Sequence, residues 1–336
     1  MDRMGCFFMT ARSIGDLRER ILTAERIGFD VAGLPQIAGR DAIAALSLIA
    51  PATTSIKLAT GIVPIWTRTP VTLAQEAGVL QEATRGRFML GIGVGHAPLI
   101  EAWHGTPFRK PLTAMRDYVT ILRSALTQAQ VSHDGATFSA HFGFLGFQPP
   151  EVPILVGALG PKMLQLAGEL ADGVVLWMSS PAHVRDIVMP NLAIGAARAG
   201  RRVEDLEVFA CLFAAPGPDR ASARDAIRRQ MFAYLQLPFY RDMLIASGFG
   251  ADLESFDAGV AAQDLPQSLA GLSDRMIDEI AATGSIDDIA QTLQGFLDAG
   301  CTVPGVGVVG GYEGYAGFEP ALGSLNHARA LVKPAV

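Results

Sequence analysis

VPILVGALGPKMLQLAGELADGVVLWM, residues 152–178, contains a complete strand–helix–strand unit. Short apolar runs at 153–158 and 173–178 are typical of buried strands. Between them, apolar residues recur on one face of a helix over 161–171, and Gly173 supplies a stop signal. Such a unit predicts a parallel sheet covered by helices.

The same alternation recurs along the 336 residues. We predict eight strands, at 4–9, 29–34, 56–63, 87–92, 153–158, 173–178, 206–213 and 303–309. We predict helices at 13–27, 41–53, 70–83, 111–127, 161–171, 182–199, 219–247 and 285–299. Eight such units predict an α/β fold, one (β/α)₈ TIM-barrel domain over residues 1–336, with its active site at the C-terminal ends of the strands.

Three predicted helices begin with side chains suited to capping. They are Asp41, Thr69 before Pro70, and Ser285 with Asp288 three residues on. Two insertions interrupt the regular pattern. Residues 130–147 alternate around an Asp-Gly pair and predict a hairpin, and residues 248–275 predict a loop or short-helix excursion over one mouth of the barrel.

An open doubly wound sheet is the alternative fold. It requires an early glycine-rich fingerprint after the first strand, and MGCFFMTARS at 4–13 has none. GIGVGHAPL at 91–99 follows a strand in mid-chain and is a weak match to that motif. The barrel therefore accounts better for the pattern.

Composition favours an enzyme acting on small molecules. Half of the residues are hydrophobic, and a net charge of -6 without long runs of Lys or Arg argues against a nucleic-acid partner or an anionic membrane surface. No run approaches the roughly 18 apolar residues of a membrane span. Cys6, Cys211 and Cys301 lie in apolar stretches without pairing or metal-ligand spacing, so we expect core thiols, no metal and a cytoplasmic location.

The sequence lacks the catalytic residues of two common classes of hydrolase, the serine hydrolases and the glycosidases. The sequence has no GxSxG elbow for a serine nucleophile. A glycosidase needs a pair of carboxylates, and the predicted strand ends instead carry Pro35, Gln36, Gly61, His96, Leu159 and Met178.

The helix predicted from residue 161 has an unusual start. Gly160 offers no side-chain oxygen for capping, and Pro161 suits the first helical position. The N–H groups of Lys162 and Met163 are then expected to point outward with the positive end of the helix dipole behind them. This arrangement suits a phosphate; the alternative is an ordinary loop capped by water.

The segments after the third and fourth strands carry further candidates. TGIVPIWTRTP at 60–70 brings Gly61, Trp66 and Arg68 to the expected mouth, where glycine permits unusual backbone geometry beside a flat ring; the alternative is a tight turn. GIGVGHAPLIEAWHG at 91–105 adds His96, Trp103 and His104. A histidine directly after a barrel strand is a candidate acid or base, although most histidines are only satisfied polar residues.

Three stretches together resemble the bacterial-luciferase-like superfamily, particularly its branch dependent on the deazaflavin coenzyme F420. They are residues 60–96, KPLTAMRDYVTILRSAL at 110–126, and the strand–helix–strand unit at 152–178. The resemblance covers roughly residues 5–310. It implies a (β/α)₈ barrel that binds a flavin or deazaflavin at the C-terminal mouth and passes a hydride to or from a substrate on the ring.

The resemblance also implies roles for individual residues. It places a non-prolyl cis peptide at Gly61–Ile62, behind the central ring. The remaining residues implied to contact the cofactor are Val94 and Gly95 beside it, and Leu159, Gly160, Lys162 and Met163 at its phosphate-bearing tail. After the second strand, many relatives have an Asp-His pair, whereas FDVAGLPQI puts Gln36 and Ile37 there. Acid–base work is then expected at His96, the alternative being that His96 only shapes the pocket.

We therefore predict an F420-dependent oxidoreductase that transfers a hydride between the deazaflavin C5 and an apolar or aromatic substrate, with His96 as the catalytic residue. The predicted substrate pocket comprises Gln36, Trp66, Arg68, Trp103 and His104. Alternatives are an FMN-dependent luciferase-like monooxygenase and a non-catalytic flavin-binding barrel. The resemblance further implies a homodimer.

Overall fold

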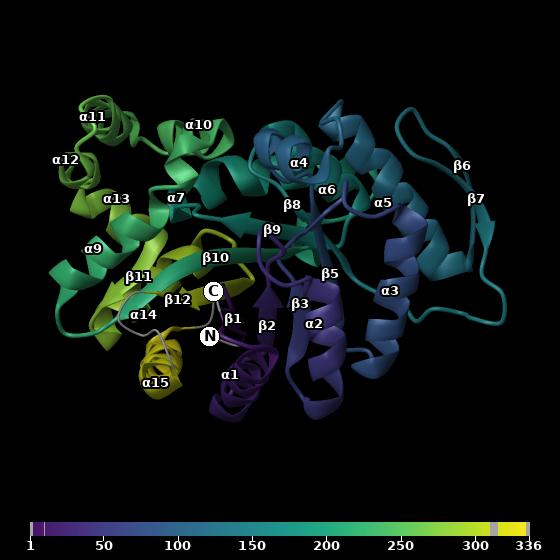
Figure 1. Cartoon of the computed structure of the whole chain (residues 1–336), viewed down its shortest axis with the longest axis horizontal. Helices are drawn as coiled ribbons and strands as arrows, with labels where there is room; N and C mark the ends of the chain where they lie inside the picture. Colours follow the sequence, from purple (N-terminus) through teal and green to yellow (C-terminus); the bar gives the residue numbers. More distant parts are fainter. Residues whose placement is uncertain (1–2, 10, 310–314, 334–336) are drawn as a thin grey trace.

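The protein, seen in a computed structural model that describes residues 3–9, 11–309 and 315–333, is built around a closed barrel of eight parallel strands (Figure 1). The strands are β1 (Gly5–Phe7), β2 (Val31–Leu34), β3 (Lys57–Thr60), β5 (Phe88–Gly93), β8 (Ile154–Gly157), β9 (Gly173–Trp177), β10 (Glu207–Pro216) and β12 (Val303–Val308). They pair in chain order, and pairing of β12 with β1 closes the ring. The predicted TIM barrel and all eight predicted strands are confirmed.

The barrel interior is filled by side chains from alternate strand positions. One buried cluster consists of Phe7, Val31, Ala59, Met89, Leu155, Val175, Phe209, Cys211 and Val303. Neighbouring positions such as Ala32 and Leu90 join the larger core shared with the surrounding helices. Because both faces of each strand are buried, the strands read as continuous apolar runs. Cys6, Cys211 and Cys301 are free and buried, as predicted.

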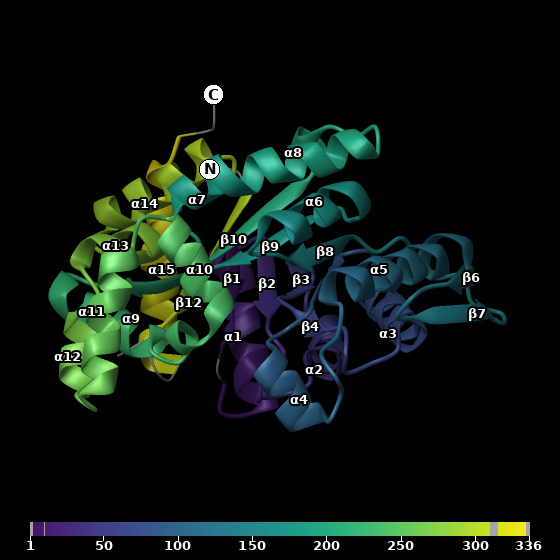
Figure 2. The same cartoon turned by 90° about the horizontal axis from the view of Figure 1, so that it is seen from above.

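Helices surround the barrel (Figures 1 and 2). The barrel helices are α1 (Ile14–Ile27), α2 (Ala42–Ile49), α3 (Pro70–Ala83), α5 (Pro111–Gln128), α6 (Pro161–Leu170), α8 (Met189–Arg198) and α14 (Ile286–Asp298). The side chains of Asp41, Thr69 and Ser285 accept backbone N–H bonds at three helix starts, as predicted. Ser285 and Asp288 form a capping box. Within the described ranges, no helix is both long and apolar enough to cross a membrane.

Several elements differ from or add to the prediction. α2 continues as a short 3₁₀ helix (Ala50–Ala52), and α8 is preceded by α7 (Pro181–His183) and a π-helical turn (Val184–Val188). The predicted third strand is divided into β3 and β4 (Val63–Pro64). Helices α4 (Ala97–His104) and α15 (Tyr315–Leu331) were not predicted.

The first insertion is the predicted hairpin. β6 (Gln130–Asp134) and β7 (Ser139–Gly143) form a two-stranded antiparallel sheet beside α3 and α5 (Figure 2). Asp117 of α5 accepts the N–H groups of Thr137 and Phe138, at 2.7 and 3.2 Å, and so fixes the turn. These backbone bonds lower the Asp117 pKa against the opposing effect of burial.

The single helix predicted at 219–247 is wrong. The chain forms α9 (Arg220–Met231), a 3₁₀ turn (Tyr234–Gln236) and α10 (Pro238–Ala246). Pro238 lacks an N–H and disfavours helical backbone at Leu237, which is extended. The second insertion follows as the short-helix excursion α11 (Gly250–Ala261), α12 (Leu265–Ala270) and α13 (Asp274–Ile280). It leads into β11 (Ala281–Gly284), an unpredicted strand that pairs with β10 outside the ring.

Candidate functional site at the barrel mouth

Ile62 forms a floor at the C-terminal mouth. The Gly61–Ile62 peptide is cis, as the resemblance implied. The Ile62 side chain occupies the space beside two strand glycines, since a Cβ added at Gly93 would lie 2.8 Å from it and one at Gly157 would lie 3.1 Å from it. Gly61 N–H donates to the Leu34 carbonyl at 3.0 Å, which ties this loop to the end of β2.

Trp66 positions the loop that follows β5. Its indole N–H donates to the Val94 carbonyl at 2.9 Å. Its ring contacts Phe108 and Phe138, with centroids 5.5 and 6.0 Å away. Gly95 comes next with φ +65°, a conformation that favours glycine. The predicted residues Trp66, Val94 and Gly95 are therefore brought together immediately before His96.

Gln36 and Arg68 are also neighbours, but as a brace between two loops. Arg68 is an ion-pair partner of Asp41 and, at 2.8 Å, of Glu76. Its side chain is 13% exposed. The Gln36 side-chain oxygen accepts from Arg68 at 3.4 Å and from Ala42 N–H at 3.3 Å. Because two carboxylates neutralise the guanidinium, Arg68 offers little net positive charge to a substrate.

His96 lies at the start of α4 and faces α10. Its ring is 5.3 Å from the ring of Tyr240 in α10, at an interplanar angle of 52°. Its Nδ1 is buried and has no hydrogen-bond partner within the part of the chain that is described. Burial lowers the His96 pKa below its ordinary value, so the imidazole is neutral at pH 7 and can accept a proton.

The other two predicted pocket residues on α4 are set apart from this group. Trp103 and His104 lie at the end of α4 opposite His96, and both are exposed, Trp103 by 50%. Ile37 is 48% exposed. It lines a separate cavity of about 220 Å³ with Phe8, Met9 and Leu34 at the ends of β1 and β2.

The β8–α6 turn has the predicted glycine-proline start. Gly160 is the N-cap with no side-chain hydrogen bond, and Pro161 is in the first turn. The Met163 N–H, however, donates to the Gly160 carbonyl at 3.1 Å, so the prediction that it points outward is wrong. A tight first turn uses this donor locally. The Lys162 side chain is exposed beside the turn.

Sequence reasoning missed the segment after β9. Met178 has φ +57°, which is uncommon for a residue with a side chain. Ser180 caps α7 through the His183 N–H, and His183 is only 3% exposed. The signal was available, because polar residues at 179–183 directly follow a predicted strand, where barrel enzymes place their sites.

Three buried polar rings lie at this mouth, on or just beyond β5 and β9: His96, Trp177 and His183. Trp177 shares a hydrogen bond with Tyr234, and the His183 ring bonds to the backbone of Leu159. Within the described residues, His96 alone of these three rings has no hydrogen bond, and its buried Nδ1 is left without a partner. Buried polar groups are normally paired, so this nitrogen fits a ligand that carries a polar atom. The described residues contain no group of three or more His, Cys, Asp or Glu able to hold a metal.

A closed (β/α)₈ barrel with buried polar groups and a cis peptide at its C-terminal mouth has the architecture of a TIM-barrel enzyme. Residues 3–302 match the family described as luciferase-like monooxygenase, and the chain belongs to that family.

Known relatives agree with this assignment. The chain is 30% identical over 306 residues to a 5,10-methylenetetrahydromethanopterin reductase of Archaeoglobus fulgidus, covering 89% of this chain and 91% of the relative. The structure of the coenzyme F420 dependent tetrahydromethanopterin reductase of Methanopyrus kandleri superposes with a TM-score of 0.81 at 22% identity, covering 96% and 97% of the two chains. The FMN-containing oxygenating component of 3,6-diketocamphane monooxygenase of Pseudomonas putida gives 0.76 at 17% identity over both full chains. These two structural matches show a shared fold.

Proposed function

We propose that this protein is an F420-dependent oxidoreductase acting on an apolar or aromatic organic substrate. The observation that carries the proposal is the buried, unpaired Nδ1 of His96 at the same mouth as the Ile62 floor. A flat ring with polar edges would cover that floor, and it or a substrate on it would pair that nitrogen. The reductase relative from Archaeoglobus fulgidus, which aligns along most of this chain, supports an oxidoreductase.

F420, when bound, supplies hydride transfer at its C5 carbon. The protein binds, orients and moves protons. In our proposal, Ile62 supports the ring from behind, Val94 and Gly95 line it, and Gly160 and Lys162 hold the phosphate-bearing tail. Leu159 and Met163 complete that tail site. His96 takes or returns the substrate proton. Trp66, Gln36 and Arg68 brace the loops, so they position the site rather than react.

The cofactor itself decides between this proposal and its alternatives. We expect the purified apoprotein to bind F420 more tightly than FMN in fluorescence or calorimetric titrations. Tighter binding of FMN, with oxygen consumption when reduced FMN and a substrate are present, would support the luciferase-like monooxygenase. Binding without any turnover would support the non-catalytic barrel. The expected cytoplasmic location and homodimer are open to cell fractionation and light scattering.

Replacing Lys162 with alanine should weaken F420 binding roughly 5- to 30-fold, the range of a charge-assisted contact. The measurement is the dissociation constant by titration at two salt concentrations. Lys57→Ala is the matched control, because Lys57 is also exposed but begins β3 at the opposite end of the barrel. Equal affinities of both variants and the wild type would remove Lys162 from the proposed tail site.

A further inference from the structure

Tyr240 reaches the mouth from α10, the helix before the excursion, rather than from a barrel strand. It lies in α10, at the same end of the molecule as α4 (Figure 1). Its ring is 5.3 Å from His96 and 5.4 Å from Tyr234, and the residue is only 7% exposed. The sequence separates His96 and Tyr240 by more than a hundred positions, so only the fold brings an imidazole and a phenol together here.

The Tyr240 hydroxyl has no hydrogen bond to any described part of the chain. Its oxygen is not one of the completely enclosed atoms that lack a partner. Buried tyrosines usually pair this group. Burial raises the Tyr240 pKa well above its ordinary value, so the phenol stays protonated and acts as a hydrogen-bond donor. A protonated donor beside a neutral imidazole forms a complementary pair of groups.

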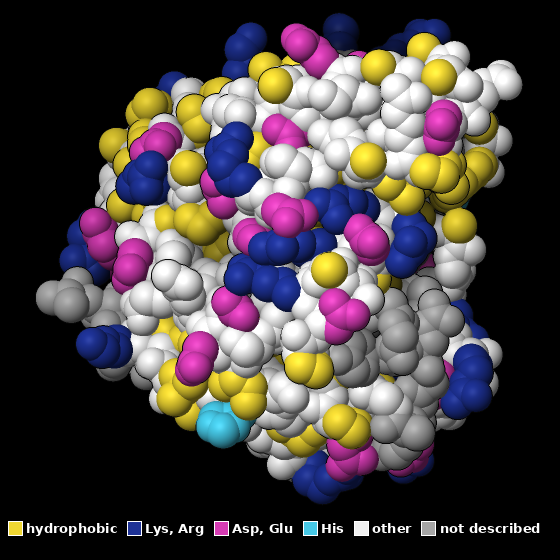
Figure 3. All heavy atoms as spheres, turned by 90° about the vertical axis from the view of Figure 1, so that its left-hand side faces the viewer, with side chains coloured by type: hydrophobic (Ala, Val, Ile, Leu, Met, Phe, Trp, Pro, Cys, Tyr) yellow, Lys and Arg dark blue, Asp and Glu magenta, His cyan; other side chains and the backbone are white. Residues whose placement is uncertain are grey.

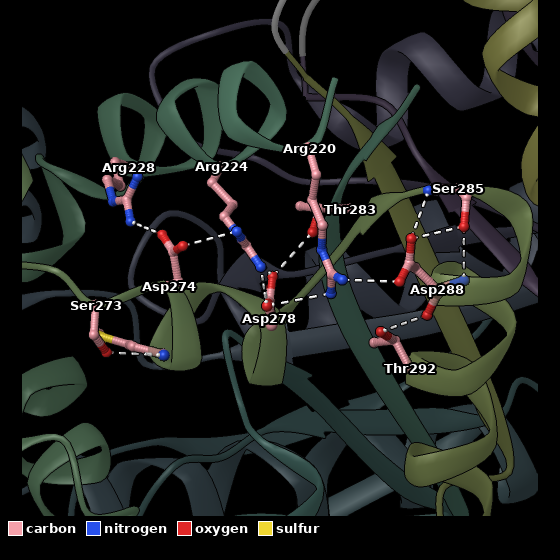
Figure 4. Close-up of polar contacts among 11 residues, drawn as sticks. Arg220, Arg224, Arg228, Ser273, Asp274, Asp278, Thr283, Ser285, Asp288 and Thr292 are labelled. Atoms are coloured by element: carbon pink, nitrogen blue, oxygen red, sulfur yellow. Dashed lines mark hydrogen bonds and ion pairs between the residues drawn. The ribbon is translucent and has the colours of Figure 1, made fainter. Parts of the chain in front are cut away.

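Ion pairs fix the segment that carries Tyr240. Arg241, the next residue, pairs with Asp257 of α11 at 2.5 Å and donates to the Leu235 carbonyl at 3.1 Å. The excursion is in turn clamped by an alternating ladder of five ion pairs of 2.5–3.2 Å (Figure 4). The ladder comprises Arg220, Arg224 and Arg228 of α9, Asp274 and Asp278 of α13, and Asp288 of α14.

The ladder lies on the side of the molecule seen in Figure 3, where positive and negative side chains are interspersed. The arginine side chains in it are only 12–37% exposed, so they bridge the helices instead of extending into solvent. The ladder ties α9 and α13 to the barrel helix α14, and Arg241 ties α10 to α11. The helix that carries Tyr240 is therefore linked by an ion pair to the clamped excursion, and a precise binding group benefits from such support.

We infer that Tyr240 is a substrate-binding residue whose hydroxyl donates a hydrogen bond to the oxygen on the carbon that exchanges the hydride. This inference rests on the proposed function. It names the substrate class as neutral alcohols and their carbonyl counterparts. The indole ring of Trp177, 5.8 Å from Tyr234, which in turn contacts Tyr240, lies nearby and suits the apolar remainder of such a substrate.

His96, Tyr240 and the deazaflavin together account for every bond change in the oxidation of an alcohol. When an alcohol is oxidised, its O–H bond breaks and His96 accepts the proton. The hydride leaves the same carbon for the deazaflavin C5, and the C=O bond forms. The Tyr240 hydroxyl keeps its proton and donates to the oxygen throughout, which stabilises the negative charge that develops there. Reduction of the carbonyl runs through the same contacts in reverse, with the proton returned by protonated His96.

Tyr240→Phe tests the inference, because it removes only the hydroxyl. Tyr234→Phe is the matched control. The Tyr234 ring contacts Tyr240 and the same hydroxyl is removed, but among the described residues Tyr234 has no ring contact with His96. The probes are cyclohexanol and benzyl alcohol with oxidised F420. We expect Tyr240→Phe to lower kcat/KM roughly 10- to 100-fold, the scale of a lost donor to developing charge. The F420 dissociation constant and the pH profile should stay unchanged, and Tyr234→Phe should stay within about threefold.

Different outcomes test the proposed function, the substrate class and the role of the Tyr240 hydroxyl. If the wild type does not bind F420, the proposed function fails. If it binds F420 but turns over none of the probes, the substrate class is overturned. A Tyr240→Phe variant with wild-type kcat/KM, or a Tyr234→Phe variant that falls equally far, overturns the role of the hydroxyl.

Discussion

Replacing Gly195 with alanine should lower the free energy of unfolding by about 1–3 kcal/mol, the usual cost of overpacking. Gly195 lies where α8 crosses α6, and an added Cβ would lie 1.9 Å from the Gln165 carbonyl oxygen and 2.9 Å from the Glu169 nitrogen. Both are backbone atoms, so no side-chain rotation relieves the clash and the helices must separate. Urea denaturation followed by circular dichroism measures the change.

Gly323→Ala is the control for Gly195→Ala. Gly323 lies inside α15, is exposed, and has no atom within 4 Å of an added Cβ. Alanine exceeds glycine in helix propensity by about 0.8–1.0 kcal/mol, so this change should raise stability. Two identical substitutions in helices are thus expected to have opposite signs. A stabilising Gly195→Ala would mean that α6 and α8 do not pack as closely as described.

Much of the barrel could be predicted because its signals are local. Strands buried on both faces appear as short apolar runs. The caps at Asp41, Thr69 and Ser285 can be recognised from each residue and its neighbours in the sequence. The error at 219–247 was avoidable, since Pro238 ends any helix that approaches it. β11 was harder to find, because Ala281–Gly284 has only one of the branched or aromatic residues typical of strands, Thr283, among two alanines and a glycine.

The candidate site depends more on contacts between distant residues. Spacing could bring Arg68 to the mouth, but its charge is neutralised by Asp41 and Glu76, which lie on other elements. The helix dipole suggested a free Met163 N–H, whereas the Gly160 carbonyl accepts it. Tyr240 carries no sequence signal for its contact with His96. Side-chain partners of this kind follow from the closed fold and not from the periodicity that predicts it.

Replacing His96 with alanine should lower turnover of a probe alcohol by roughly 10²–10⁴-fold, the usual range for a general acid or base. His96 follows β5 at the mouth, and burial lowers its pKa, so the neutral form that accepts a proton prevails at pH 7. F420 affinity should change little, because the variant keeps the Ile62 floor and the β8–α6 turn. Steady-state kinetics and cofactor titration measure the two effects separately.

The pH profile distinguishes proton transfer by His96 from a role in shaping the pocket. In the oxidative direction the wild-type kcat/KM should fall as the pH drops through the His96 pKa, which lies below the ordinary value, because protonated imidazole cannot accept the substrate proton. His96→Ala should lose this limb and recover part of its rate when imidazole is added to the buffer. His141→Ala, a change at an exposed histidine of the hairpin, should behave as the wild type. If His96→Ala keeps both the turnover and the acidic limb, the base is another group and His96 serves only to pack against Tyr240.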